Sequence, residues 1–186
     1  SSRRRHTRYG TVTGVQTCAL PISVFQHPMP DSDTIASFYP DDYGVYQREE
    51  KLKGPSDLKK AVLRYRYGYR HLQSPLVLRL LAPLVSAFFY KENVHYKPNG
   101  RALDVGCASG HFLRTLQMLG WRCEGVEFNQ TAVETCRFQG LTVHHGNLES
   151  ARLDNDSFDL ITVRHVIEHL ADPESLVREA SQILRP

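Results

Sequence analysis

The sequence predicts an α/β fold, a doubly wound and mostly parallel sheet that follows an N-terminal helical segment. From Arg101 onward, short apolar runs alternate with stretches of helical periodicity, and the links between them are short. The run RALDVGCASG, residues 101–110, joins a buried strand to a helix through two glycines that permit a tight turn. Such alternation is typical of parallel strands joined by right-handed crossovers.

Each element of this part has a local signal of its own. Four runs rich in apolar and β-branched residues are expected to be strands: 101–105, 122–127, 141–145 and 158–163. Three amphipathic stretches are expected to be helices: one from the end of the glycine turn to residue 119, one over 129–139 and one over 173–184. Gly120 and Gly140 are expected to end the first two helices, while Asp172 and Pro173 are expected to start the third.

Residues 23–96 are expected to form a Tyr/Pro-rich segment followed by a helical lid or cap. A short helix near 31–38 is expected first, followed by aromatic residues at 39–46 that either cover the pocket as a lid or pack against the helical part. A helix from Ser56 to about Gln73 is expected next. The most apolar stretch, 76–90, is expected to be a buried helix, kinked at Pro83 and packed against the sheet. It is too short to span a bilayer, and a helix lying on a membrane surface stays open as an alternative.

The first 22 residues are expected to be an artefact rather than part of the fold. Residues 12–22, VTGVQTCALPI, are the in-frame translation of a common sequencing-library adapter, and residues 1–8 fit its upstream primer. We expect this segment to be disordered and exclude it. Its four arginines account for the net charge of +3, so the charge gives no reason to expect nucleic-acid binding.

Neither the cysteines nor the histidines predict a metal site. Outside the adapter segment the cysteines are Cys107, Cys123 and Cys136, an odd number without C-x-x-C spacing, which suits a reducing, cytoplasmic setting. Residues 165–169, HVIEH, match the zinc motif H-x-x-E-H. That motif needs one long helix, whereas here a strand runs directly into it, so we expect no metal.

The strand-to-helix turn carries the pattern D-x-G-x-x-x-G through Asp104, Gly106 and Gly110. This pattern resembles motif I of the class I S-adenosylmethionine (SAM)-dependent methyltransferases, with Ala108 at the position of the usual middle glycine. The alternative is a nicotinamide dinucleotide site, whose G-x-G-x-x-G pattern would need glycine at 106, 108 and 111. Only the first of these is glycine.

Glu127 ends the second strand, where doubly wound sheets bind their ligands, and it could accept both hydroxyls of a ribose. The resemblance implies that Asp104, with the turn from Gly106 through Cys107 and Ala108 to Gly110, holds the amino-acid end of SAM. It also implies that Phe128 contacts the cofactor, and that the Asn147 side chain and the Leu148 amide contact the adenine. The family usually has an acid where this chain has Asn147, so an ordinary turn asparagine is the alternative.

Residues 158–170, FDLITVRHVIEHL, are similar to the family's segment at the end of the fourth strand. The resemblance implies that Arg164 and His165 line the pocket near the reactive sulfonium, and His165 is the candidate general base. The motifs DVGCASG, GVEFN, GNLE and this segment occur in the family's order over residues 97–186, which we expect to be a partial SAM-binding domain.

The resemblance implies transfer of a methyl group from SAM to a small-molecule, sugar or lipid-type acceptor. A non-catalytic SAM-fold protein and an NAD-type oxidoreductase are the alternatives. Because the family would continue with further strands, we expect a chain truncated after the fourth strand and its helix to expose a sheet edge and to be weakly active or inactive. No nucleic-acid partner and no integral membrane segment are expected, and the sequence leaves the oligomeric state open.

Overall fold

The computed structural model describes residues 16–20, 23–27, 53–88, 94–170 and 172–186. The helix expected near 31–38 and the aromatic lid expected at 39–46 lie outside the described residues. The chain divides into two units, residues 1–39 and 40–186, each with its own internal contacts. Among the described residues, no helix is both long enough and apolar enough to cross a membrane.

The first unit contains an antiparallel hairpin of β1 (Gln16–Leu20) and β2 (Ser23–His27), with Gln16 opposite His27. Strand β1 lies inside the segment that we expected to be disordered, so the structure differs from that expectation. The partner strand explains the difference, because β2 contains Val24 and Phe25, which favour extended backbone. An isolated two-stranded hairpin has only marginal stability in water.

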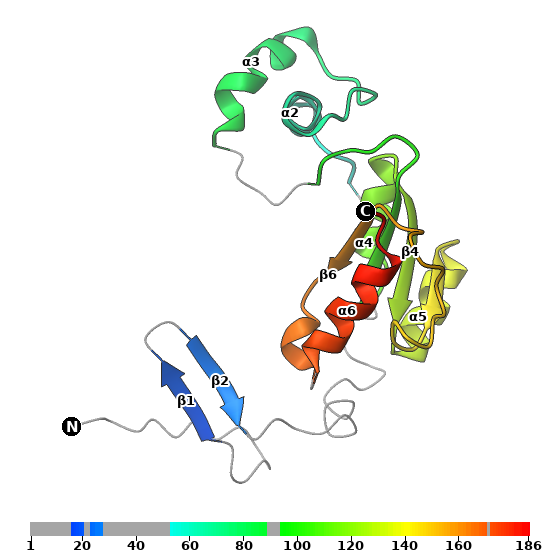
Figure 1. Cartoon of the computed structure of the whole chain (residues 1–186). Helices are drawn as coiled ribbons and strands as arrows, with labels where there is room; N and C mark the ends of the chain where they lie inside the picture. Colours follow the sequence, from blue (N-terminus) through cyan, green and yellow to red (C-terminus); the bar gives the residue numbers. More distant parts are fainter. Residues whose placement is uncertain (1–15, 21–22, 28–52, 89–93, 171) are drawn as a thin grey trace, which may run out of the picture. The chain divides into compact units, whose positions relative to one another are not determined.

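The second unit is built on four parallel strands: β3 (Arg101–Val105), β4 (Arg122–Glu127), β5 (Thr142–His145) and β6 (Leu160–Val163). Their order across the sheet is β5-β4-β3-β6 (Figure 1). The chain therefore moves outward from β3 to β5 and returns to the other side of β3 with β6. This reversal next to β3 is the switch in strand order at which doubly wound sheets bind ligands. The predicted α/β fold is confirmed.

Three helices follow these strands: α4 (His111–Met118), α5 (Gln130–Phe138) and α6 (Pro173–Ile183). Local caps set their ends as predicted, since the Asn129 side chain accepts the Ala132 amide at 2.9 Å and Asp172 accepts the Ser175 amide at 3.1 Å. Gly120 and Gly140, which follow α4 and α5, have positive φ angles.

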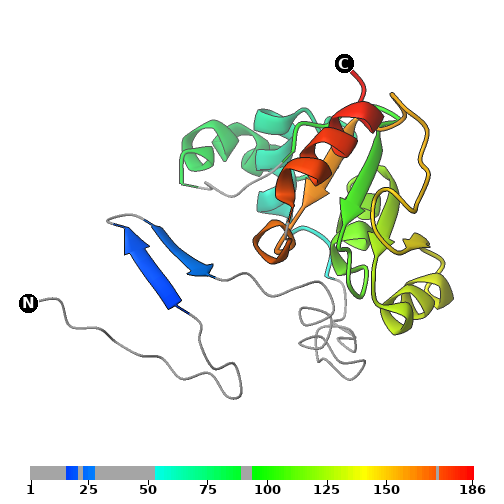
Figure 2. The same cartoon turned by 60° about the horizontal axis from the view of Figure 1, so that its bottom comes forward.

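The helices cover both faces of the sheet with two apolar cores (Figures 1 and 2). One core joins α4 and α5 to the sheet through Leu113, Val133 and Val143. The other joins α6 to the opposite face through Leu103 and Leu176. Adjacent residues of β3 point to opposite faces, and both faces are covered by helices. The carboxyl ends of the strands are therefore the edge available to a ligand.

The N-terminal helices differ from the expectation. Helix α2 (Asp57–Tyr67) begins at the predicted cap, where Ser56 accepts the Lys59 amide at 3.3 Å, but it ends at Gly68 rather than near Gln73. The reason is that Gly68 takes the left-handed conformation with φ of 78°. Helix α3 (Leu76–Ser86) contains Pro83, as expected.

The expectation that this apolar helix is buried against the sheet was wrong. Helix α3 packs on α2 and buries the small residues Ala82 and Ser86, whereas its large apolar side chains are exposed. Small residues on the inner face let the two helices approach closely, which leaves the leucines on the outer side.

Aromatic residues that follow α2 and precede β3 attach the helical segment to the second unit. The Trp121 indole N–H donates to the Tyr69 hydroxyl at 3.1 Å, and both side chains are buried. Tyr96 stacks near Tyr69 at 4.9 Å between ring centroids, and His71 Nε2 lies 3.1 Å from the Leu119 carbonyl oxygen. This aromatic cluster makes Tyr69 part of the core that α4 and the sheet share, with Tyr96 packed against it.

Strand β6 lies at the end of the strand order in the sheet. Just before it in the chain, Phe158 forms a parallel bridge with Leu184. Asp159 lies at the same corner with its side chain 1% exposed, and its carboxylate meets Lys97 at 2.7 Å and Arg185 at 2.9 Å. Burial alone would raise the pKa of Asp159, but hydrogen bonds from Lys97, Arg101 and Arg185 outweigh it and hold the pKa well below its usual range.

Candidate functional site

The turn between β3 and α4 is held in an unusual backbone conformation. Gly106, Ala108 and Gly110 all have positive φ, of 73°, 46° and 74°. The amides of Gly106 and Cys107 donate to the Val126 carbonyl oxygen at 2.8 and 3.2 Å, which fixes the turn against β4. Ala108 carries strain that a glycine would avoid, because a Cβ atom disfavours left-handed backbone.

Crowding explains why both glycines are needed. A Cβ atom on Gly110 would lie 2.3 Å from Leu141 Cδ1 and 3.0 Å from Cys136 Sγ, so Gly110 serves helix–strand packing. A Cβ atom on Gly106 would lie 2.2 Å from Val166 Cγ2. Val166 therefore covers Gly106 from the end of β6, a contact that sequence reasoning missed.

Glu127 connects the two loops at the carboxyl ends of β3 and β4. Its side chain is buried, and its two oxygens accept the Ala108 amide at 2.8 Å and the Asn129 amide at 2.9 Å. The structure thus brings Glu127 directly to the glycine turn, as its position after β4 led us to expect. Each carboxylate oxygen keeps a second lone pair that another donor could use.

Asp104 is the second buried acid at this edge, 3% exposed in the central strand β3. Its Oδ1 accepts the hydroxyl of Thr162 on β6 at 2.7 Å. Burial raises the pKa of Asp104, the Thr162 hydrogen bond and the charge of Arg164 lower it, and the charge of Glu127 raises it; together they bring this pKa to about 6. No pattern in the sequence predicted the Thr162 partner, which lies 58 residues away.

Cys107 contributes to the turn through its backbone, since its side chain is buried in the core beneath. Its Sγ would lie 2.6 Å from a Cβ atom on Gly125, and its thiol is hydrogen-bonded to that of Cys136. Cys136 Sγ in turn lies 3.2 Å from the Ala108 carbonyl oxygen. Cys107, Cys123 and Cys136 are free thiols.

The residues expected to contact the adenine lie at the ends of β4 and β5. Asn147 Oδ1 accepts the Ser150 amide at 2.8 Å, so this oxygen stabilises its own turn. The Leu148 side chain is buried in the core, and the Phe128 ring is 69% exposed. The Phe128 carbonyl oxygen lies 2.9 Å from His145 Nε2, which ties the two strand ends together.

The residues expected at the reactive end follow β6. The Arg164 guanidinium lies over the Phe112 ring at 4.1 Å, which connects β6 to α4. His165 has a φ angle of 56°, its side chain is 87% exposed, and its Nδ1 lies 3.6 Å from Glu168 Oε1. The structure therefore places Arg164 toward α4 but His165 in solvent.

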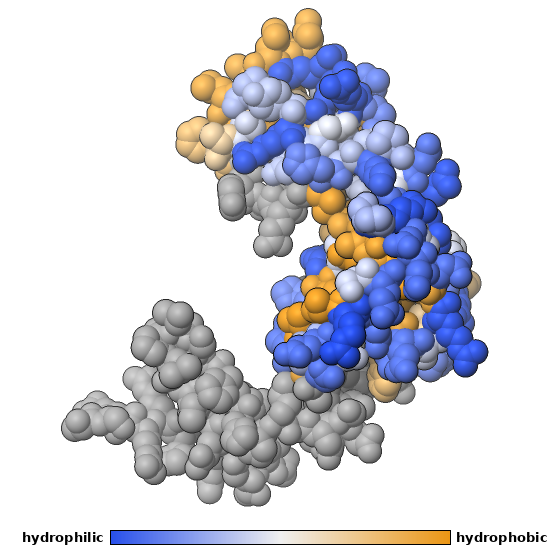
Figure 3. Space-filling view, viewed as in Figure 1, coloured by the Kyte–Doolittle hydropathy of each residue, from blue (hydrophilic) through white to orange (hydrophobic). Residues whose placement is uncertain are grey.

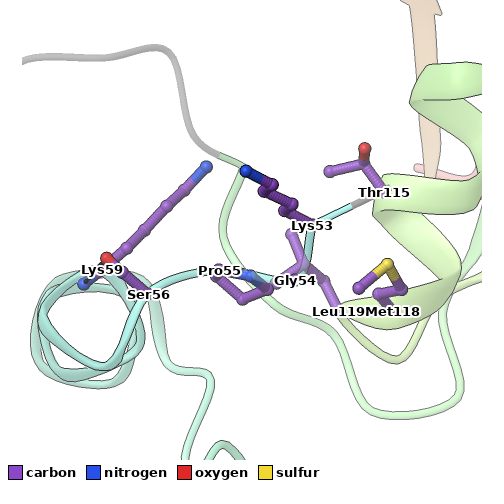
Figure 4. Close-up of a pocket in the computed structure, with 8 residues that line it drawn as sticks. All are labelled: Lys53, Gly54, Pro55, Ser56, Lys59, Thr115, Met118 and Leu119. Atoms are coloured by element: carbon purple, nitrogen blue, oxygen red, sulfur yellow. Dashed lines mark hydrogen bonds between the residues drawn. The ribbon is translucent and has the colours of Figure 1, made fainter. Parts of the chain in front are cut away.

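Two other features remain, one directly after Val166 and one at the far end of α4. Ile167–His169 of the H-x-x-E-H match form one 3-10 turn, and the described residues contain no group of three metal-ligating side chains around a common point. A cavity of about 180 Å³ lies between the start of α2 and the end of α4 (Figure 4). Its lining includes Lys53, Lys59 and Met118, at the opposite end of α4 from the glycine turn.

Comparison with known proteins identifies the family. Residues 69–186 match the family described as methyltransferase domain. The chain is 31% identical over 93 residues to the ubiquinone biosynthesis O-methyltransferase of Methylococcus capsulatus, which covers 46% of this chain and 39% of that protein. It is 29% identical over 92 residues to the uncharacterized methyltransferase YcgJ of Bacillus subtilis, covering 46% and 36%.

Solved structures of methyltransferases are also similar to part of the chain. The crystal structure of YcgJ is 29% identical and covers 48% of this chain and 41% of its own, with a TM-score of 0.43. A SAM-dependent methyltransferase from Thermotoga maritima is 31% identical with the same coverage and a TM-score of 0.41. The chain spans about two fifths of the length of the curated relatives that it matches first. With the profile match over more than half of its residues, the chain belongs to the class I SAM-dependent methyltransferase family, whose cofactor is S-adenosylmethionine.

Proposed function

We propose that the whole protein transfers a methyl group from SAM to a small-molecule, sugar or lipid-type acceptor. One observation carries the proposal: Asp104 and Glu127 are buried carboxylates at the ends of neighbouring parallel strands, on either side of a glycine turn. The name of the Methylococcus capsulatus relative, an O-methyltransferase of ubiquinone biosynthesis, supports a small-molecule acceptor.

The chemistry of the two acids fits the proposed cofactor. SAM, when bound, supplies an electrophilic methyl group on a positively charged sulfur and carries a cationic amino group beside a ribose. Asp104 would hold the amino group, because a cation offsets the cost of keeping a carboxylate buried. Glu127 would accept the ribose hydroxyls with the lone pairs that the Ala108 and Asn129 amides leave available.

The remaining contacts follow from the loops around these acids. The turn from Gly106 to Gly110, including Cys107 and Ala108, would offer backbone groups to the amino-acid end. Phe128, with its ring exposed, would pack on the adenine, and the Leu148 amide would hydrogen-bond it. Because Asn147 Oδ1 already accepts the Ser150 amide, we assign Asn147 the role of shaping the loop that holds the adenine.

The acceptor would be positioned at the end of β6. His165 is the group that we assign to taking the acceptor's proton, since its Nδ1 faces Glu168 and its Nε2 is left toward solvent. Arg164 would keep this segment against α4 through its contact with Phe112. Positioning of two reactants in line can supply about 7–11 kcal/mol of the barrier, so His165 would add a smaller part.

Calorimetric titration with SAM and with NAD⁺ tests the cofactor. Saturable binding of SAM with no binding of NAD⁺ is expected, and the opposite result would refute the proposal and favour the oxidoreductase alternative. Methyl release from labelled SAM, with and without phenolic, sugar and lipid acceptors, tests the reaction. SAM binding without transfer to any of them would favour a non-catalytic SAM-fold protein.

A further inference from the structure

Helix α3 presents a stripe of large apolar side chains to solvent. The α3 stripe consists of Leu76, Val77, Leu80, Leu81, Leu84 and Phe88, which are between 45% and 86% exposed. At about 100° per residue, the five that belong to the helix fall within an arc of roughly 140°. Figure 3 shows the apolar surface of this region together on its outer side.

The stripe is not the face by which the helix is held in place. Ala82 and Ser86 are buried on the side that packs on α2. Arg66 of α2 donates through Nη1 to the Ser86 carbonyl oxygen at 3.1 Å, which anchors the end of α3. Because α3 is already held by this inner face, its outer apolar surface marks an interaction site.

The same segment has a strong net positive charge. Residues 53–88 contain seven Lys or Arg side chains and one acid, Asp57, a net charge of +6. Residues 94–186 contain nine basic and twelve acidic side chains, a net charge of −3. The basic residues of the helical segment are Lys53, Lys59, Lys60, Arg64, Arg66, Arg70 and Arg79. Positive charge and exposed apolar surface are therefore concentrated together.

We propose that α3 docks through its stripe on the surface of an anionic lipid bilayer. A helix that lies in a membrane interface inserts an apolar face while basic side chains meet the lipid head groups. A lipid surface fits better than a protein groove because the stripe is one continuous row of aliphatic side chains ending in Phe88, with no polar side chain to specify a partner. The proposal is independent of methyl transfer.

Vesicle co-sedimentation of the chain tests this proposal. Binding to vesicles of phosphatidylcholine mixed with phosphatidylglycerol is expected, with weaker binding to phosphatidylcholine alone and a further loss at high salt. The double variant Leu80→Glu/Leu84→Glu is expected to lower the partition coefficient ~10-fold or more. Phe138→Glu is the matched control, because Phe138 is 94% exposed on α5 and its replacement should change nothing.

A charge-reversal pair tests the electrostatic part. Arg70→Glu/Arg79→Glu is expected to weaken binding to the anionic vesicles ~10-fold or more, since each basic residue near such a surface contributes about 1 kcal/mol. Arg178→Glu on α6 is the control and should bind as the parent does. Circular dichroism of each variant checks that the helices are retained.

Three outcomes would overturn the proposal. The first is equal vesicle binding by the parent and by Leu80→Glu/Leu84→Glu. The second is equal binding to neutral and anionic vesicles. The third is a dimer in light scattering that this variant converts to a monomer while neither form binds vesicles, which would make the stripe a contact between copies of the chain.

Discussion

Replacing Asp104 with asparagine should make the cofactor-free protein more stable while weakening its affinity for SAM. The carboxyl group is 3% exposed and faces the charge of Glu127, so burial raises its pKa from 3.8 to about 6. Asparagine removes the charge, and its side-chain oxygen can still accept the Thr162 hydroxyl that Asp104 accepts at 2.7 Å.

The size of the effect follows from the pKa shift. The pKa of Asp104 is about two pH units higher in the folded state than in the unfolded state. This difference corresponds to about 3 kcal/mol of lost stability once the carboxyl group is ionised in both states. The new amide N–H groups also need partners, so the expected gain of Asp104→Asn near neutral pH is about 1–3 kcal/mol.

The sign of the pH dependence isolates this group. The pKa of Asp104 is higher in the folded protein than in the unfolded chain. The contribution of its protonated carboxyl group to the free energy of unfolding is therefore complete below the unfolded pKa and is lost as the pH rises through about 6. The advantage of the asparagine variant should therefore be absent near pH ~4 and complete near pH ~7.5. Urea unfolding of both proteins across this range measures it.

Calorimetry at neutral pH completes the test, since the same variant should bind SAM more weakly than the parent. A variant that is less stable than the parent by the same amount at every pH would show that Asp104 is a structural hydrogen-bonding group. Such a result would contradict the proposal that the Asp104 carboxylate binds the cationic amino group of SAM.

Four further substitutions test the site and its surroundings. Glu127→Gln should weaken SAM binding ~10–100-fold and lower stability by about 1–3 kcal/mol, because its side-chain NH2 would face one of the two backbone N–H groups that the two carboxylate oxygens accept; calorimetry and urea unfolding measure it, with Glu134→Gln as control. Ala108→Gly should raise the urea midpoint by relieving its φ of 46°, a gain of about 0.5–1 kcal/mol, and a lower midpoint would contradict this. Gly106→Ala should cost more than Gly140→Ala in thermal unfolding, since both have positive φ but only the first meets an atom within 4 Å; equal losses would refute the crowding. Asp159→Asn should destabilise most at neutral pH, with the difference fading as acid protonates the parent through its lowered pKa, and a pH-independent difference would argue against this.

Local signals explain why the sheet and its helices could be predicted. Asn129 and Asp172 cap helices within a few residues of themselves, and Gly120 and Gly140 end them, so α5 and α6 lie within two residues of their expected bounds. The end of α2 was missed because a single glycine, Gly68, can be tolerated inside a helix.

The orientation of α3 could not be predicted for a different reason. Its residues are apolar almost all the way around, so periodicity does not identify the face that packs. The structure uses the smallest side chains, Ala82 and Ser86, for contact with α2.

The candidate site was predictable where a residue's place along a strand decides its position. Asp104 and Glu127 follow from strand ends and spacing, whereas their partners come from elsewhere in the chain. Thr162 lies 58 residues from Asp104, and Val166 meets Gly106 only because β6 pairs with β3. The Asn147 side chain was expected to contact adenine, but its oxygen accepts the Ser150 amide within its own turn.

The hydrogen bond between Trp121 and Tyr69 means that the loop after α2 belongs to the core that supports the sheet. A shortened protein that starts at β3 would expose to water the Trp121 indole and the apolar side chains packed around it, between α4 and β4. Shortening experiments on this protein should therefore keep everything from the end of α2 onward, even if only the nucleotide-facing half is wanted.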